Sequence, residues 1–198
     1  MKNRLCASIF AVAALLALPA LSLFAQEPES TLEKIERTGE FLIGYRTDSS
    51  PLSYENAEGE PSGYSVDFCR RIAASVNAHF DKKDIEAKFV RISAEERISA
   101  VVNGKVDIEC GSTTITLSRQ EHVDFSLPTF VTGGSVLSLA SSGIQTMSDL
   151  AGKRVGVAKD TTTVEELRHY IKENLIDAEV VIVADRNEGM KRLNGGGI

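Results

Sequence analysis

The chain has 198 residues, of which 42% are hydrophobic and 25% are charged. This ordinary globular composition excludes a fibrous chain and a wholly disordered one. With 22 Lys and Arg against 28 Asp and Glu, the net charge is −6, and an acidic chain lacks the basic surface that nucleic-acid binding needs. Three cysteines are too few for a disulfide-built fold. We therefore expect one domain or two small ones, with no nucleic acid as partner.

The N-terminal segment has the layout of a secretory signal peptide. Lys2 and Arg4 precede an apolar run over residues 5–18, and small residues lead up to Ala25. We predict cleavage after Ala25, with Ala20 as the less favoured site. A membrane anchor is the alternative, but a bilayer needs a run of roughly 18–20 apolar residues. Cleavage would leave an exported protein with 20 basic and 28 acidic residues, a net charge of −8.

The rest of the chain alternates between amphipathic helices and short apolar strands. The expected helices cover residues 31–39, 64–80, 93–103, 146–151, 161–174 and 185–194. The expected strands cover residues 41–45, 87–92, 106–110, 135–140, 154–158 and 180–183. Long loops are expected over 46–63 and 111–124, and the helix over 93–103 is expected to bury Ile98, Val101 and Val102. This alternation predicts the α/β class, with parallel sheets covered by helices on both faces.

Polar side chains follow the predicted strands where ligands bind in open α/β sheets, beyond the carboxyl ends. Arg46 ends the first strand, and Ser112, Thr114 and Arg119 follow the strand that ends at Cys110. Hydroxyls, backbone N–H groups and a guanidinium fork together suit a carboxylate. Alone, such a segment is more often an exposed polar loop, so the hypothesis depends on the other groups nearby.

Two further groups support an anion site. Thr161 and Thr162 open a predicted helix, where free N–H groups attract anions; simple capping would explain one threonine but not three in a row. Arg97 lies in the first turns of another helix, where a cation opposes the helix dipole unless it has another task. The alternative for Arg97 is an exposed residue that pairs with Glu95 or another nearby acid.

Several segments together resemble extracellular solute-binding protein family 3, the periplasmic amino-acid-binding components of ABC transporters. The stretch from Glu109 to Thr114, with Arg119 and Gln120, is most similar to the glutamate/aspartate-binding branch. The similarity runs from about Thr31 to the last residue. The segments that carry it are Phe41–Arg46, Gly63–Asp67, Asn103–Asp107 and Cys110–Thr114 with Arg119.

The resemblance implies a two-lobed, type II periplasmic-binding fold with a hinge between the lobes. Family members have well over 200 mature residues, so the chain is expected to be C-terminally truncated, with the second lobe and the return crossing incomplete. The acidic residue that holds the ligand α-ammonium would then lie beyond Ile198. The expected parts are a signal peptide over 1–25, a linker over 26–30, lobe 1 over 31–126, a hinge crossing over 127–134 and lobe 2 over 135–198.

The resemblance also implies a role for each candidate site residue. Arg119, with Ser112 and Thr114, would hold the ligand α-carboxylate. Arg46 and Arg97 would hold the side-chain carboxylate of an acidic amino acid. Thr161, Thr162 and Arg186 would contribute from lobe 2.

Two departures from the branch leave the ligand open. Arg186 falls where the branch has a histidine, and Ala94 falls where it has a serine, with Ser93 adjacent. Glutamate and aspartate are the expected ligands, but glutamine or another polar amino acid stays open. Cys69 and Cys110 either pair as a disulfide or remain buried thiols.

The predicted function is transport: a monomer whose lobes close on an acidic amino acid and deliver it to a membrane permease. No catalytic residue, cofactor or metal is expected. The alternatives are an enzyme of the cyclohexadienyl dehydratase type on the same fold, or a ligand-sensing receptor domain. An enzyme would need a base at the site, and His79, His122 and His169 are each better explained as exposed or ion-paired residues.

Overall fold

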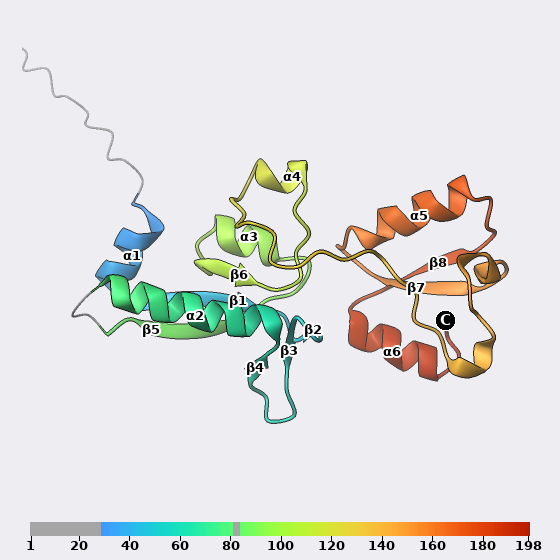
Figure 1. Cartoon of the computed structure of the whole chain (residues 1–198), viewed down its shortest axis with the longest axis horizontal. Helices are drawn as coiled ribbons and strands as arrows, with labels where there is room; N and C mark the ends of the chain where they lie inside the picture. The colour runs from blue at the N-terminus through green and yellow to red at the C-terminus, as the bar shows by residue number, and fades with distance from the viewer. Residues whose placement is uncertain (1–28, 81–83) are drawn as a thin grey trace, which may run out of the picture. The chain divides into compact units, whose positions relative to one another are not determined.

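The computed structural model describes residues 29–80 and 84–198 (Figure 1). The predicted signal peptide and its cleavage sites lie outside the described residues. Within these two ranges, no helix has the length and apolar character needed to cross a bilayer.

Six α-helices, two 3₁₀ turns and eight strands are formed in the described ranges. The helices are α1 (Thr31–Thr38), α2 (Tyr64–His79), α3 (Arg97–Val102), α4 (Leu117–Gln120), α5 (Thr163–Glu173) and α6 (Arg186–Asn194), and the 3₁₀ turns are η1 (Ala140–Ser142) and η2 (Met147–Leu150). The strands are β1 (Glu40–Tyr45), β2 (Asp48–Ser49), β3 (Ser53–Glu55), β4 (Pro61–Ser62), β5 (Glu86–Arg91), β6 (Ile108–Cys110), β7 (Arg154–Ala158) and β8 (Glu179–Val183).

The first parallel sheet has the strand order β5-β1-β6. Its central strand β1 pairs along its whole length with β5, and at its carboxyl end with β6, where Gly44 lies opposite Glu109. One face packs under α1 and α2 through a core that contains Ile35, Phe41 and Cys69. On the other face, Ala100 of α3 packs with Ile92 and Val106. The predicted α/β arrangement with helices on both faces is therefore confirmed for this sheet.

A turn before β6 holds the edge of this sheet in register. The side chain of Asp107 is almost fully buried, and its Oδ1 accepts a hydrogen bond from Nζ of Lys34 at 2.7 Å. Its Oδ2 accepts from the backbone N–H of Leu42 at 2.9 Å. One carboxylate thus joins α1, β1 and the start of β6, and it sets the position from which β6 leads into the polar loop.

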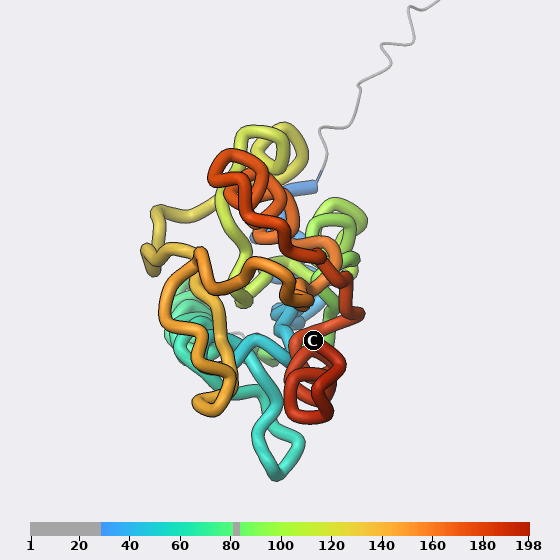
Figure 2. The backbone as a smooth tube through the Cα atoms, turned by 90° about the vertical axis from the view of Figure 1, so that its right-hand side faces the viewer, coloured from blue at the N-terminus to red at the C-terminus, as the bar shows by residue number. Residues whose placement is uncertain are grey.

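The second parallel sheet consists of β7 and β8, which pair over five positions from Arg154↔Glu179 to Ala158↔Val183. Val157, Val183 and Leu167 of α5 are buried here. The strand predicted over 135–140 does not form. Among the described residues no strand pairs with it, and Leu137 is 65% exposed; a strand needs a neighbour for its N–H and C=O groups. The backbone between α4 and η1 runs without helix or strand (Figure 2).

Two predicted loops contain regular structure. The stretch after β1 folds into a small antiparallel sheet, β2-β3-β4, whose turn is held where the backbone N–H of Arg46 donates to Oγ of Ser53 at 2.9 Å. The stretch after β6 contains α4, which begins where the Thr116 side chain accepts from the backbone N–H of Arg119. Both elements are too short to show a hydrophobic period, so the sequence pattern did not predict them.

The buried face of α3 was predicted only in part: Val101 packs against the core as predicted, but Val102 does not, and the most buried residues are others. Val102 is 55% exposed, whereas Arg97 and Ala100 are 3% exposed. The helix begins at Arg97, four residues later than predicted, and residues three apart share a helix face. A charged residue therefore occupies a core-facing position, and the small Ala100 lets the helix approach the sheet.

Cys69 of α2 and Cys110 at the end of β6 are joined by a disulfide, with their Cα atoms 6.3 Å apart. This pairing answers the choice between a disulfide and two thiols that the sequence left open. It ties the helix that covers the sheet to the strand end from which the polar loop at Gly111 departs.

Candidate ligand-binding site

Four arginines from separate elements lie close enough for their charges to interact. Arg46 follows β1, Arg97 begins α3, Arg119 lies in α4 and Arg186 begins α6. Burial, together with the charges of Arg119, Arg46 and Arg186, lowers the pKa of Arg97 to about 10, while Glu109 opposes them. The structure therefore brings together the four arginines that the sequence singled out.

Two of these arginines are almost fully buried with part of their hydrogen-bonding capacity unused. Arg46 is 2% exposed, and its Nη2 forms an ion pair with Oδ1 of Asp48 at 2.5 Å. Arg97 donates from Nη2 to the carbonyl oxygen of Asp160 at 2.9 Å. Within the described ranges, Nη1 of Arg46 and Nε of Arg97 are buried without a partner. A buried cation with free N–H groups is costly, so the cluster is suited to accept an anion.

The loop after β6 supplies the hydroxyls expected at a carboxylate site. Nη1 of Arg119 donates to the carbonyl oxygen of Thr114 at 2.8 Å, which orders the guanidinium against this loop. Oγ of Ser112 donates to Oγ of Ser49 at 3.4 Å. Ser65 holds the loop from α2, because its hydroxyl donates to the carbonyl oxygen of Gly111 at 2.7 Å.

The two threonines before α5 differ in their contacts. The hydroxyl of Thr162 lies 3.4 Å from that of Thr114, so the predicted contribution from the second half of the chain reaches the first. The hydroxyl of Thr161 donates to the carbonyl oxygen of Ala158 at 2.7 Å and serves the local turn. Next to them, Nζ of Lys159 forms an ion pair with Oε2 of Glu95 at 2.7 Å.

Arg186 meets the small sheet that follows β1. Its backbone N–H donates to Oδ2 of Asp48 at 3.1 Å, and its Nη1 donates to Oγ of Ser49. Burial lowers the pKa of the Arg186 guanidinium, and Asp48 opposes this effect. Asp48 is therefore shared by Arg46 and Arg186, a role that the sequence did not predict.

Glu109 is a second site residue that the sequence reasoning missed. Its Oε1 is buried and, among the described residues, lacks a hydrogen-bond partner. Burial raises the pKa of its carboxyl, and Thr113, Arg97, Arg46 and Arg119 oppose the rise. Alternation along the strand could have found it: the flanking Ile108 and Cys110 contact the core under α2, so Glu109 faces the opposite side.

At the departures from the branch pattern, Ala94 is 9% exposed and has no polar side-chain atom to offer. The neighbouring Ser93 accepts a hydrogen bond from the backbone N–H of Glu96 at 3.2 Å, which is the capping contact its sequence position predicted.

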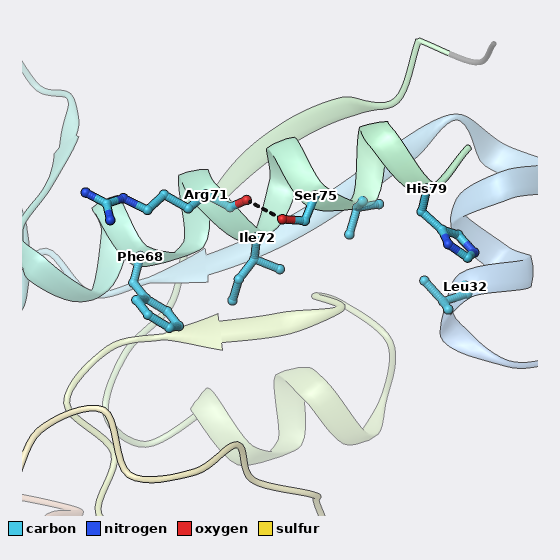
Figure 3. A pocket seen from close by; sticks show the side chains of 7 residues that line it. Leu32, Phe68, Arg71, Ile72, Ser75 and His79 are labelled. Atoms are coloured by element: carbon cyan, nitrogen blue, oxygen red, sulfur yellow. Dashed lines mark hydrogen bonds between the residues drawn. The ribbon is translucent and has the colours of Figure 1, made fainter. Parts of the chain in front are cut away.

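An apolar hollow of about 420 Å³ lies along α2, and none of the four site arginines lines it (Figure 3). It is lined by side chains of α1 and α2 that include Leu32, Phe68, Ile72 and His79. A larger hollow of about 1020 Å³ is lined mainly by residues of the second half of the chain, including Thr161 and Arg186, and Asp48 of the first half lines it too. The described ranges hold no group of three or more His, Cys, Asp and Glu placed to bind a metal ion.

Residues 41–190 match the model for bacterial extracellular solute-binding proteins, family 3. The chain belongs to this family.

Two curated relatives are named for acidic amino acids. The L-glutamate/L-aspartate-binding protein of Pseudomonas aeruginosa is 33% identical over 98% of this chain and 64% of its own length. The glutamate/aspartate import solute-binding protein of Salmonella typhimurium is 34% identical over 84% of this chain and 55% of its own length. The chain therefore spans between about half and two thirds of these relatives.

Solved structures agree on the fold. A periplasmic binding protein of an ABC transporter from Brucella ovis, solved with glutathione bound, superposes with a TM-score of 0.75 and 27% identity over 84% of this chain and 52% of its own. An ancestral amino acid-binding protein, a precursor of cyclohexadienyl dehydratase, gives a TM-score of 0.71 and 27% identity over 84% and 70%. The predicted type II periplasmic-binding fold is confirmed.

Proposed function

We propose that the protein binds an acidic amino acid, glutamate or aspartate, as the solute-binding component of an ABC importer in the periplasm. The observation that carries the proposal is the cluster of four arginines, in which buried N–H groups of Arg46 and Arg97 have no partner among the described residues. The names of the two curated relatives support the same ligand class.

The charges favour a ligand with two carboxylates. Against the four guanidinium groups, the acidic side chains found to interact with the cluster within residues 29–80 and 84–198 are Asp48 and Glu109. A neutral amino acid offers one carboxylate, for which one arginine fork suffices. The remaining positive charge would then stay buried and uncompensated, at a cost of several kcal/mol.

In the proposed complex, Arg119, Ser112 and Thr114 hold the α-carboxylate, and Arg46 and Arg97 hold the side-chain carboxylate. Each charge-assisted hydrogen bond contributes about 1.5–3 kcal/mol. After the costs of ordering and closure, a few such bonds support a micromolar or tighter Kd, near −8 kcal/mol.

Thr162 and Arg186 contribute from the second lobe, and Thr161 shapes the turn that presents Thr162. Lobe 1 (31–126) and lobe 2 (135–198) close about the hinge over 127–134, because a ligand that bridges them binds the closed form more tightly. The closed monomer then docks on a membrane permease, and the ligand leaves chemically unchanged.

Isothermal titration calorimetry with L-glutamate, L-aspartate and L-glutamine tests the proposal. We expect micromolar or tighter binding of glutamate or aspartate, and binding of glutamine that is at least tenfold weaker. Equal affinity for glutamine would contradict the acidic ligand. Turnover of prephenate or arogenate would replace the transport function with that of a cyclohexadienyl dehydratase.

A further inference from the structure

Glu109 lies under the loop that holds the candidate carboxylate site. A Cβ atom placed on Gly111 would lie 2.0 Å from Oε1 of Glu109 and 3.2 Å from Cγ of Arg46. The carboxylate and the arginine stem therefore both border the space beneath Gly111. Because residue 111 is glycine, this space is available to the carboxylate of Glu109.

The groups that face this carboxylate are mostly cationic. Arg46 comes from the end of β1, Arg97 from α3 and Arg119 from α4, and the hydroxyl of Thr113 comes from the loop itself. These are also the three arginines of the first half of the chain that the proposed function assigns to the two ligand carboxylates. A negative charge on Glu109 therefore acts on the same guanidinium groups as the ligand.

We propose that Glu109 is a built-in counter-charge of the arginine cluster, and that its protonation state sets how tightly the site holds an acidic amino acid. This inference rests on the proposed function. When Glu109 is ionised, it compensates part of the positive charge and repels an anionic ligand. When it takes up a proton, the full charge of the arginines is available to the ligand.

The sign of the pH dependence follows from linkage. Burial already raises the pKa of Glu109 in the free protein, and a bound anion raises it further because like charges disfavour ionisation. Binding of L-glutamate therefore takes up a proton, and affinity rises as the pH falls through the pKa of Glu109. A free glutamate side chain titrates near pH 4.3, so the ligand is still ionised at about pH 5 and above.

The test is calorimetry of L-glutamate binding between about pH 5 and about pH 8, in buffers with different ionisation enthalpies. The full chain should take up a fraction of a proton up to one proton per ligand. Its affinity should rise on acidification by up to about tenfold for each unit by which the ligand raises the pKa. Glu109→Gln should show neither effect, and should bind L-glutamate more tightly than the unmodified protein at about pH 8.

The control is Glu86→Gln, the same chemical change in β5, where Glu86 pairs in register with Glu40 at the far end of β1 from Glu109. It should keep the proton uptake and the pH dependence. Glu109→Asp retains a titrating group and should keep an uptake of protons.

The outcomes separate this inference from the proposed function. If the unmodified protein binds no acidic amino acid at any pH, the proposed function fails. If it binds L-glutamate without proton uptake at any pH in the range, or if Glu109→Gln keeps the uptake, only the role of Glu109 is overturned. Absence of proton uptake by the unmodified protein overturns the role even where Glu109→Gln does not fold, and Glu109→Asp then serves as the second variant for the positive result.

Discussion

Nη2 of Arg97 donates a hydrogen bond to the carbonyl oxygen of Asp160 across 63 positions of the chain, at 2.9 Å. Arg97 begins α3 beside the first sheet, and Asp160 lies in the turn between β7 and α5. The contact uses one nitrogen of the guanidinium, while Nε remains buried without a partner among the described residues. A planar cation with several donors can hold a backbone turn and still bind an anion.

Arg97→Lys tests this dual use. Lysine lacks the fork, and its ordinary pKa is lower than that of arginine, so the burial that lowers the pKa of Arg97 to about 10 would favour a neutral amine. We expect the affinity for glutamate or aspartate to fall by about tenfold or more, the equivalent of one charge-assisted bond, as measured by calorimetry near pH 8. Arg91→Lys, at an exposed ion pair with Glu55, is the matched control. Unchanged affinity in Arg97→Lys would show that this guanidinium does not contact the ligand.

Arg119 and Arg46 should differ in which ligands they affect. Arg119→Ala removes the partner of the α-carboxylate and should abolish binding of every amino acid. Arg46→Ala should weaken acidic ligands selectively, because it removes a partner of the side-chain carboxylate.

Titrations with L-glutamate and L-glutamine measure this difference, and a thermal melt must accompany them, since Arg46→Ala also leaves the buried Asp48 without its ion pair. If both variants lose acidic and neutral ligands to the same extent, the separate roles are wrong.

Gly111→Ala should weaken ligand binding indirectly, because the added methyl group meets Glu109 and not the ligand. The new Cβ would lie 2.0 Å from Oε1 of Glu109, so the carboxylate and the loop must shift. We expect a loss of about 1–3 kcal/mol in the free energy of unfolding, typical of overpacking, and weaker binding of acidic amino acids. Gly133→Ala has nothing within 4 Å of its Cβ and should change stability by less than about 0.5 kcal/mol. Equal denaturation curves for the two variants would count against the tight packing of Gly111.

The disulfide between Cys69 and Cys110 encloses a segment with a sequence separation of 41. The chain-entropy relation assigns a loop of this length about 4 kcal/mol of stabilisation at 25 °C. Urea denaturation of the oxidised protein should therefore show a higher midpoint than that of a Cys69→Ser, Cys110→Ser double variant. Thiol titration of the unfolded, unreduced protein checks the pairing, and two reactive thiols in the mature chain would refute it.

The sequence predicted those parts of the fold that repeat a hydrophobic pattern. The five-residue strand β7 and the helix α2, with Val66, Cys69 and Ala73 buried along one face, are long enough to show a period. The strand predicted over 135–140 depended on a pairing partner, which an apolar pattern cannot supply.

The arginines of the site could be predicted because they follow the carboxyl ends of strands or begin helices, positions that the topology brings together. Glu109 was harder to predict, because it lies within a strand of three residues. Its importance depends on burial and on neighbours from three other elements. Asp48 was missed for a similar reason: its partner Arg46 lies two positions before it and its partner Arg186 lies 138 positions after it, and only the folded chain shows both contacts.

Asp48 divides its two carboxylate oxygens between two donors. Oδ1 accepts from the guanidinium of Arg46, and Oδ2 accepts from the backbone N–H of Arg186. An asparagine of the same shape would carry an NH₂ group in place of one oxygen and would set a donor against a donor, whichever way the amide turned. In either orientation, an asparagine would therefore lose one of the two contacts. It would loosen either α6 or Arg46, because a neutral side chain cannot accept from both donors.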